Sequence, residues 1–136
     1  IINIAIRYFE EQNDTIFLIR SYNRLSRMYR LKNNIEKSIN TINKSLKLSK
    51  ELKNEKLISI AYIEYHICNI NKEKSISYLK EFLKSKEDLP LNAYIYYNIY
   101  HYLKENNAKL KAIKVYTSLY KKINRFEYKY YLNKLK

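Results

Sequence analysis

The feature that most restricts the fold of this chain is the absence of glycine from its 136 residues. Tight hairpins, phosphate-cradling loops and nucleotide-binding turns need backbone that takes a positive φ or approaches a ligand closely, and glycine normally supplies it. P-loop and Rossmann chemistry are therefore excluded. Only one proline is present, so the chain has few helix breakers and is predicted to be all-α, with short turns between its helices.

Size and apolar content predict one folded domain over residues 1–136. Hydrophobic residues make up 46% of the chain and aromatic residues 15%, which is enough apolar surface to offset the entropy of the unfolded chain. A chain of this length is expected to bury one continuous core.

A short motif recurs every 37 residues, with Ser38, Ser75 and Ala112 at its centre, each preceded by lysine and followed by isoleucine. Downstream of each motif, mostly apolar side chains follow at spacings of three and four residues, which places them on one helical face. These positions are Ile42, Leu79 and Tyr116, then Ser45, Phe82 and Leu119, then Leu46, Leu83 and Tyr120. One period earlier the pattern falls on Ile2, Ala5 and Phe9, so the chain is expected to begin inside a repeat and to be part of a longer protein.

Asparagine is expected to replace glycine at the breaks between helices. It clusters at 33–34, 69–71 and 106–107, and it takes the left-handed conformation that closes a helix more readily than most residues. Further breaks fall at 13–15, 53–55 and 87–90, where Pro90 suits a first helical turn. The predicted helices are 1–12, 15–31, 35–52, 55–68, 72–86, 90–105, 108–123 and 126–134.

One hairpin resembles the tetratricopeptide repeat. The order of bulky, apolar, small and aromatic side chains is that of the family at all seven positions, Tyr22, Leu25, Ser26, Tyr29, Ser38, Ile42 and Ser45. The resemblance implies a right-handed α-α superhelix of three to four hairpins. They are a half repeat at 1–12, hairpins at 15–52, 55–86 and 90–123, and a terminal helix at 126–134. In the middle hairpin two registers stay open, with Tyr62 and His66 inward or with Ala61, Tyr62 and Tyr65 inward.

In this family the first helices of the hairpins line a concave groove. If Tyr22 and Ser26 face the core, the predicted groove residues of the first full hairpin are Arg20, Asn23, Arg27 and Arg30. The composition suggests AT-biased codons, which favour lysine, so arginines on one helix need another cause. Planar guanidinium groups suit carboxylate recognition. The alternative is an exposed charged face paired with Glu10, Glu11 or Glu36.

The same register in the third hairpin predicts that the groove continues along Tyr94, Tyr97, Asn98, His101 and Lys104. Tyrosine offers a large contact area and a hydrogen-bonding hydroxyl, and asparagine can bond both backbone groups of an extended peptide. The alternative is that most of the 16 tyrosines fill the core and its rim.

Catalysis is not expected. His66 and His101 are the only histidines, and neither lies in a metal-ligand motif. The carboxylates are spread among lysines without a pair that looks buried, so acid–base chemistry has no candidate. We therefore expect a non-enzymatic protein with no cofactor and no metal.

Three functions compete. The first is the ligand-sensing domain of a bacterial cytosolic regulator, because the repeats resemble those of Gram-positive peptide-pheromone receptors of the Rap and PlcR type, which bind a short peptide. The second is a generic scaffold or adaptor for a protein partner. The third is direct binding of nucleic acid by a basic groove, since the formal net charge is +14.

The sequence also predicts where the protein is located and what its first helix contacts. A single cysteine, Cys68, cannot form an internal disulfide, so a cytoplasmic location is expected. No apolar stretch is long enough to span a membrane. The half repeat at Ile1 to Phe9 exposes a face that needs more chain upstream or self-association.

Overall fold

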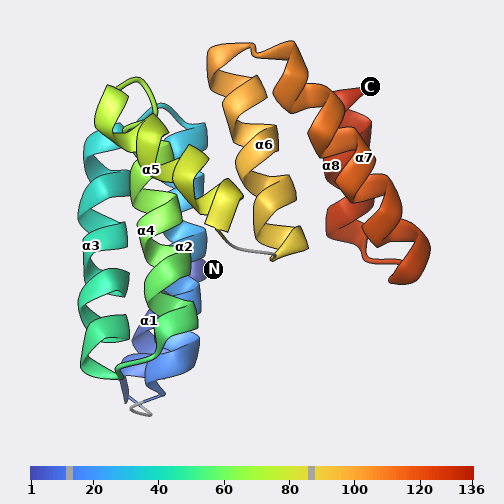
Figure 1. The fold of residues 1–136 in the computed structure, drawn as a ribbon. Coiled ribbons are helices and arrows are strands. Elements are labelled where there is room, and N and C mark those ends of the chain that lie inside the picture. Colours follow the sequence, from blue (N-terminus) through green and yellow to red (C-terminus); the bar gives the residue numbers. More distant parts are fainter. Residues whose placement is uncertain (12–13, 86–87) are drawn as a thin grey trace. The chain divides into compact units, whose positions relative to one another are not determined.

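The computed structural model describes residues 1–11, 14–85 and 88–136, and within these ranges every regular element is a helix (Figure 1). The helices are α1 (Ile2–Glu11), α2 (Thr15–Leu31), α3 (Ile35–Glu51), α4 (Glu55–Cys68), α5 (Glu73–Ser85), α6 (Leu89–Leu103), α7 (Asn106–Lys122) and α8 (Phe126–Leu135). The all-α prediction is confirmed, and the predicted boundaries agree to within about two residues. The predictions that fall on Gln12, Asn13, Lys86 and Glu87 lie outside the described residues.

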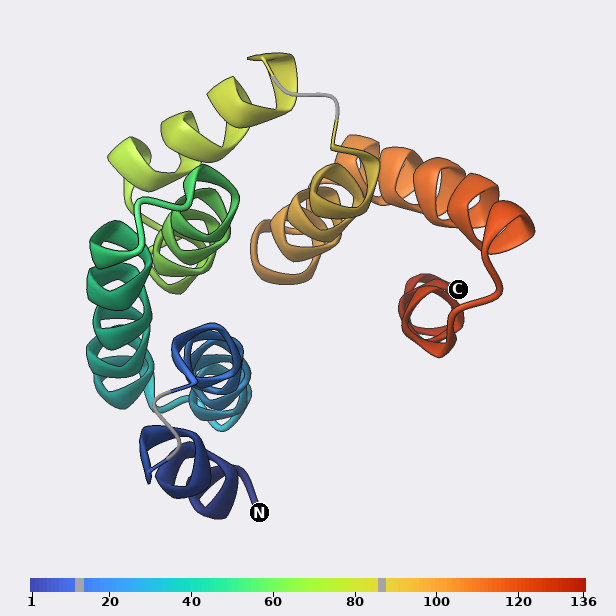
Figure 2. The same cartoon turned by 90° about the horizontal axis from the view of Figure 1, so that it is seen from below.

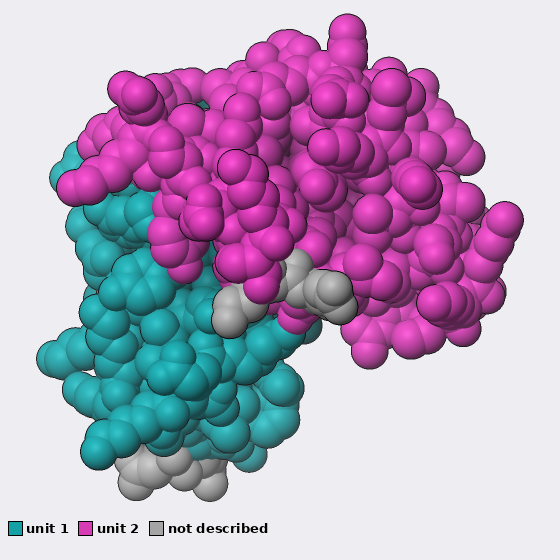
Figure 3. Space-filling view, viewed as in Figure 1, with its two compact units in different colours: residues 1–69 teal, residues 70–136 magenta. Residues whose placement is uncertain are grey.

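The chain divides into two compact units (Figure 3). Unit 1 comprises residues Ile1–Asn69, with α1 to α4, and unit 2 comprises residues Ile70–Lys136, with α5 to α8. The boundary falls between α4 and α5, inside the hairpin expected at 55–86. That hairpin, and a single repeat domain over 1–136, therefore stay predictions.

In unit 1, α3 lies beside both α2 and α4, and α1 packs on α2 (Figures 1 and 2). Two fully buried serines lie where α2 packs against α3. The hydroxyl of Ser26 donates to the backbone carbonyl oxygen of Ser38 at 2.9 Å, and the hydroxyl of Ser38 donates to the backbone carbonyl oxygen of Ser26 at 2.7 Å. Small side chains let the two backbones approach, and the reciprocal bonds satisfy both hydroxyls in the absence of water.

Burial follows the 37-residue repeat. The positions at the centre of the motif and on the predicted inward stripe are all buried: Ser38, Ser75 and Ala112, Ile42, Leu79 and Tyr116, and Ser45, Phe82 and Leu119. The third set, Leu46, Leu83 and Tyr120, is half-buried. The predicted amphipathic stripes are thus confirmed at their central positions.

The core of unit 2 is built largely from aromatic side chains where α7 packs against α6 and α8. Tyr116 is 1% exposed, and its ring stacks on that of Tyr131 with centroids 5.2 Å apart. Tyr128, Leu132 and Leu135 close the cluster from α8. Many tyrosines of this half of the chain therefore act as core or rim residues.

In the middle of the chain, α4 follows neither predicted register fully. Ala61, Ile63, Glu64 and Ile67 are buried, whereas Tyr62, Tyr65 and His66 are only half-buried. Both alternatives depended on Tyr62, Tyr65 or His66, and these side chains lie at the edge of the buried face of α4. The smaller and aliphatic side chains between them occupy the interior.

The helix breaks lie where they were predicted, but the left-handed conformation expected of asparagine there is confirmed at one site and wrong at others. Asn33 takes a left-handed conformation, with φ of 60°. Asn69 has φ of −109°, however, and Asn106 is already the first residue of α7. The other left-handed residues of the described chain are Lys53 and Lys104.

Two asparagines instead cap the beginnings of helices. The side chain of Asn34 accepts a hydrogen bond from the backbone N–H of Lys37, and that of Asn54 accepts one from Leu57. A short side-chain oxygen can satisfy an N–H that has no partner within the helix, which makes asparagine a good N-cap. Pro90 lies in the first turn of α6, as predicted. Among the described residues, no helix is both long and apolar enough to cross a membrane.

Candidate binding surfaces

The four residues predicted on α2 occupy different environments in unit 1. Arg20 is exposed, with its guanidinium carbon 5.6 Å from the centroid of the Phe17 ring. Asn23 is buried, and its side-chain oxygen accepts a hydrogen bond from the hydroxyl of Ser45 on α3. Asn23 therefore joins α2 to α3.

Arg27 and Arg30 converge on one carboxylate, that of Glu64 on α4. Arg27 Nε lies 2.6 Å from Glu64 Oε1, and Arg30 Nη1 lies 2.8 Å from Glu64 Oε2. The side chains of Arg30 and Glu64 are only 4% and 1% exposed, whereas that of Arg27 is 32% exposed. Because each carboxylate oxygen accepts a charge-assisted bond, the three residues form a closed cluster that ties α4 to α2.

The electrostatics of this cluster keep Glu64 ionised. Burial raises the pKa of Glu64, but the positive charges of Arg27 and Arg30 and their hydrogen bonds outweigh burial, so that its pKa lies below the usual value of 4.5. The carboxylate thus stays charged at neutral pH and compensates much of the positive charge of the two arginines.

Glu64 was not among the residues predicted from the sequence, although its single carboxylate is buried and bound by two arginines. The signal was available, because Glu64 lies 37 residues after Arg27. Applying the α2 register to α4 therefore puts Glu64 on the same stripe, one repeat later. It is also the sole acid in the apolar stretch between Leu57 and Cys68.

The five residues predicted on α6 lie in unit 2 and contribute mostly to internal packing. Tyr94 is 5% exposed, with its edge against the ring of Tyr131. Asn98 is 2% exposed and donates to the carbonyl oxygen of Tyr94 at 2.8 Å, one turn earlier. Tyr94 and Asn98 therefore offer little surface to a ligand.

The remaining three residues lie nearer the surface. The rings of Tyr97 and His101 stack with centroids 5.7 Å apart, and His101 is exposed. Lys104 is exposed at the end of α6, with Nζ 5.7 Å from the centroid of the Tyr100 ring. The predicted residues of α2 and α6 belong to different units, so a groove shared by the two sets stays a prediction.

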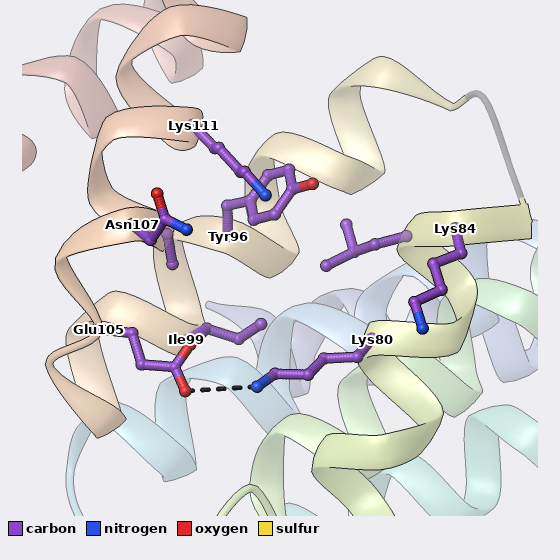
Figure 4. A pocket seen from close by; sticks show the side chains of 9 residues that line it. Lys80, Lys84, Tyr96, Ile99, Glu105, Asn107 and Lys111 are labelled. Atoms are coloured by element: carbon purple, nitrogen blue, oxygen red, sulfur yellow. Dashed lines mark hydrogen bonds and ion pairs between the residues drawn. The ribbon is translucent and has the colours of Figure 1, made fainter.

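Unit 2 contains a cleft that the sequence did not predict, formed where α5, α6 and the start of α7 meet (Figure 4). Its volume is about 270 Å³. Its apolar walls come from Leu83, Ile99 and Ala108, and its polar lining comes from Lys80, Lys84, Tyr96, Glu105, Asn107 and Lys111. This cleft, called the basic cleft below, combines apolar surface with an excess of positive charge.

The three lysines of the basic cleft have different partners. Lys80 forms an ion pair with Glu105 at 3.4 Å, and Lys111 Nζ lies 5.5 Å from the centroid of the Tyr96 ring. Lys84 makes no ion pair or ring contact with any other residue that the structure describes. An acidic ligand would therefore find at least one ammonium group available without displacing a neighbour.

None of the nine residues predicted to bind a ligand lines the basic cleft. On α6 the cleft is lined by Tyr96 and Ile99. The predicted residues Tyr97 and His101 stack on each other and do not line it. The available sequence signal was the pair Lys80 and Lys84, since residues four apart lie on one helical face.

No three histidine, cysteine, aspartate or glutamate side chains gather as a metal site in the described part of the chain. Comparison of the chain with protein-family models found no match, and comparisons with curated proteins and with solved structures found none either.

Proposed function

We propose that this chain is a non-catalytic helical-repeat module, of tetratricopeptide-like construction, that binds an acidic peptide or protein segment. The right-handed superhelix of three to four hairpins is part of this proposal. It is supported by the close contact between Ser26 and Ser38 and by burial that recurs every 37 residues. Repeats of this kind expose extended surfaces on which peptides bind.

The observation that carries the binding proposal is the basic cleft. Small-molecule and peptide sites combine apolar surface with a few polar groups that fix orientation. Here Leu83, Ile99 and Ala108 supply the apolar surface, and lysines on α5 and α7 supply the charge. An acidic side chain next to an apolar one matches this lining.

Within this proposal, the module is the ligand-sensing part of a cytosolic regulator, a role that rests on the resemblance to peptide-pheromone receptors. A scaffold for a protein partner would use the same cleft for a segment of that partner. The high positive charge also favours a second candidate, direct binding of nucleic acid.

The test is to measure the binding of fluorescent peptides rich in glutamate and leucine to the 136-residue chain by anisotropy at two salt concentrations. Replacing Lys80, Lys84 and Lys111 by alanine removes the charge of the cleft. Replacing Lys47, Lys74 and Lys122, which are exposed elsewhere, gives a control with the same net charge.

If the cleft binds the peptide, the first variant loses at least about tenfold in affinity, or roughly 1.4 kcal/mol, and the control loses much less. Equal losses in both variants, or no binding by the wild type, would contradict the proposal. Tighter binding of a polynucleotide, with affinity falling steeply as salt increases, would favour the nucleic-acid alternative.

A further inference from the structure

The ion pair between Lys80 and Glu105 brings an acidic side chain of the protein itself into the basic cleft (Figure 4). Lys80 belongs to α5, and Glu105 is the residue that precedes α7. The distance between Lys80 Nζ and Glu105 Oε1 is 3.4 Å, and the two side chains are 51% and 42% exposed. A carboxylate therefore already occupies the position that an acidic ligand would seek.

The carboxylate of Glu105 is not used to cap the helix that follows. Glu105 is the N-cap residue of α7, a position where a side-chain oxygen commonly accepts a bond from the helix, but its side chain makes no such bond. It reaches across to α5 instead. Substitution of Glu105 therefore removes no capping hydrogen bond from the start of α7.

We propose that Glu105 is an internal competitor for the basic cleft, and that an acidic ligand places its own carboxylate on Lys80 in place of Glu105. This inference rests on the function proposed above and defines its ligand more closely. Exposed ion pairs are weak because water solvates both partners. A ligand can thus displace Glu105 easily, whereas the negative charge of Glu105 opposes any ligand that carries the same charge.

The lining around Lys80 indicates the chemistry of the ligand. The apolar side chains of Leu83 and Ile99 line the same cleft as Lys80, and Lys84 adds a second positive charge one helical turn further along α5. The matching ligand is a peptide segment in which an aspartate or glutamate adjoins a leucine-like side chain. Because the ligand must displace Glu105 from Lys80, a ligand with more than one acidic group is expected to bind more tightly than a ligand with one.

The test is to measure how the same glutamate- and leucine-containing peptide binds to the wild type and to Glu105→Gln, which keeps the size of the side chain and removes its charge. Glu81→Gln is the matched control, because Glu81 is an exposed glutamate on α5 that does not line the cleft. We expect Glu105→Gln to bind the peptide about two- to fivefold more tightly, and Glu81→Gln to bind like the wild type.

A double variant, Lys80→Met with Glu105→Gln, should lose the gain, because the freed ammonium group is then absent. Binding by the wild type combined with unchanged or weaker binding by Glu105→Gln would overturn the competitor role while leaving the proposed function standing. An equal gain in Glu81→Gln would also overturn it, since the effect would then be general charge. If neither the wild type nor Glu105→Gln binds the peptide, the proposed function itself fails.

Discussion

Arg30 Nη1 donates a hydrogen bond to Glu64 Oε2 at 2.8 Å, with both side chains almost fully excluded from solvent. The two residues lie 34 positions apart and join α2 to α4, the first helices of two successive predicted hairpins. Because a buried ion must be compensated, this pair favours the arrangement of unit 1 in which α4 lies against α2.

The first prediction concerns the stability of unit 1. Glu64→Ala leaves Arg30 buried without its carboxylate, so the free energy of unfolding should fall by about 3–5 kcal/mol. Urea denaturation followed by circular dichroism measures this change. Glu51→Ala, which removes an exposed glutamate of the same unit, should change the stability by less than about 0.5 kcal/mol. A similar small effect for Glu64→Ala would show that the buried cluster contributes little.

The second prediction concerns pH. Since the pKa of Glu64 is lowered in the folded protein, the stabilisation by its ionised form is fully present above the usual pKa of 4.5. It is lost as the pH falls below that value and through the folded-state pKa. The stability gap between the wild type and Glu64→Gln should therefore narrow progressively as the pH is lowered below 4.5.

Denaturation of both proteins over a series of pH values tests this prediction. His66 is present in both chains, so the fall in stability caused by its burial-lowered pKa, which lies below the usual 6.5, is expected to cancel in the comparison. A gap that stays constant down to strongly acidic pH would mean that Glu64 does not titrate as its surroundings indicate.

The third prediction concerns the close contact between α2 and α3. Ser38→Leu adds volume at a fully buried position and removes the hydroxyl that bonds the carbonyl oxygen of Ser26. It should lower the free energy of unfolding by about 1–3 kcal/mol or more. The control is Asn40→Leu, on an exposed position of the same helix. If both variants unfold at the same urea concentration, the small residue at position 38 is not needed for helix packing.

Much of the local structure could be predicted because it depends on residues close together in the chain. Helix boundaries were predictable from breaks such as that at Asn33 and Asn34, where capping and left-handed conformations have clear preferences. The buried stripe through Ser38, Ile42 and Ser45 was predictable because one face of an amphipathic helix must leave water.

The choice of left-handed residues was less predictable. Lys53 and Lys104 take a positive φ, whereas the sequence predicted this conformation for asparagines at other positions. Residues outside the usual set adopt this conformation when the chain must turn at a given point between two packed helices.

The sequence by itself determined which residues form helices, which face of α3, α5 and α7 is buried and where the 37-residue pattern recurs, because these properties follow from local backbone preferences and apolar periodicity. Only the tertiary structure decided that Glu64 would neutralise Arg27 and Arg30, and that Lys80, Lys84 and Lys111 would surround one cleft. Periodicity identifies an inward face but not the residues opposite it. Those partners are fixed by how helices pack across tens of residues, where side-chain volumes and the need to compensate buried charge select one arrangement.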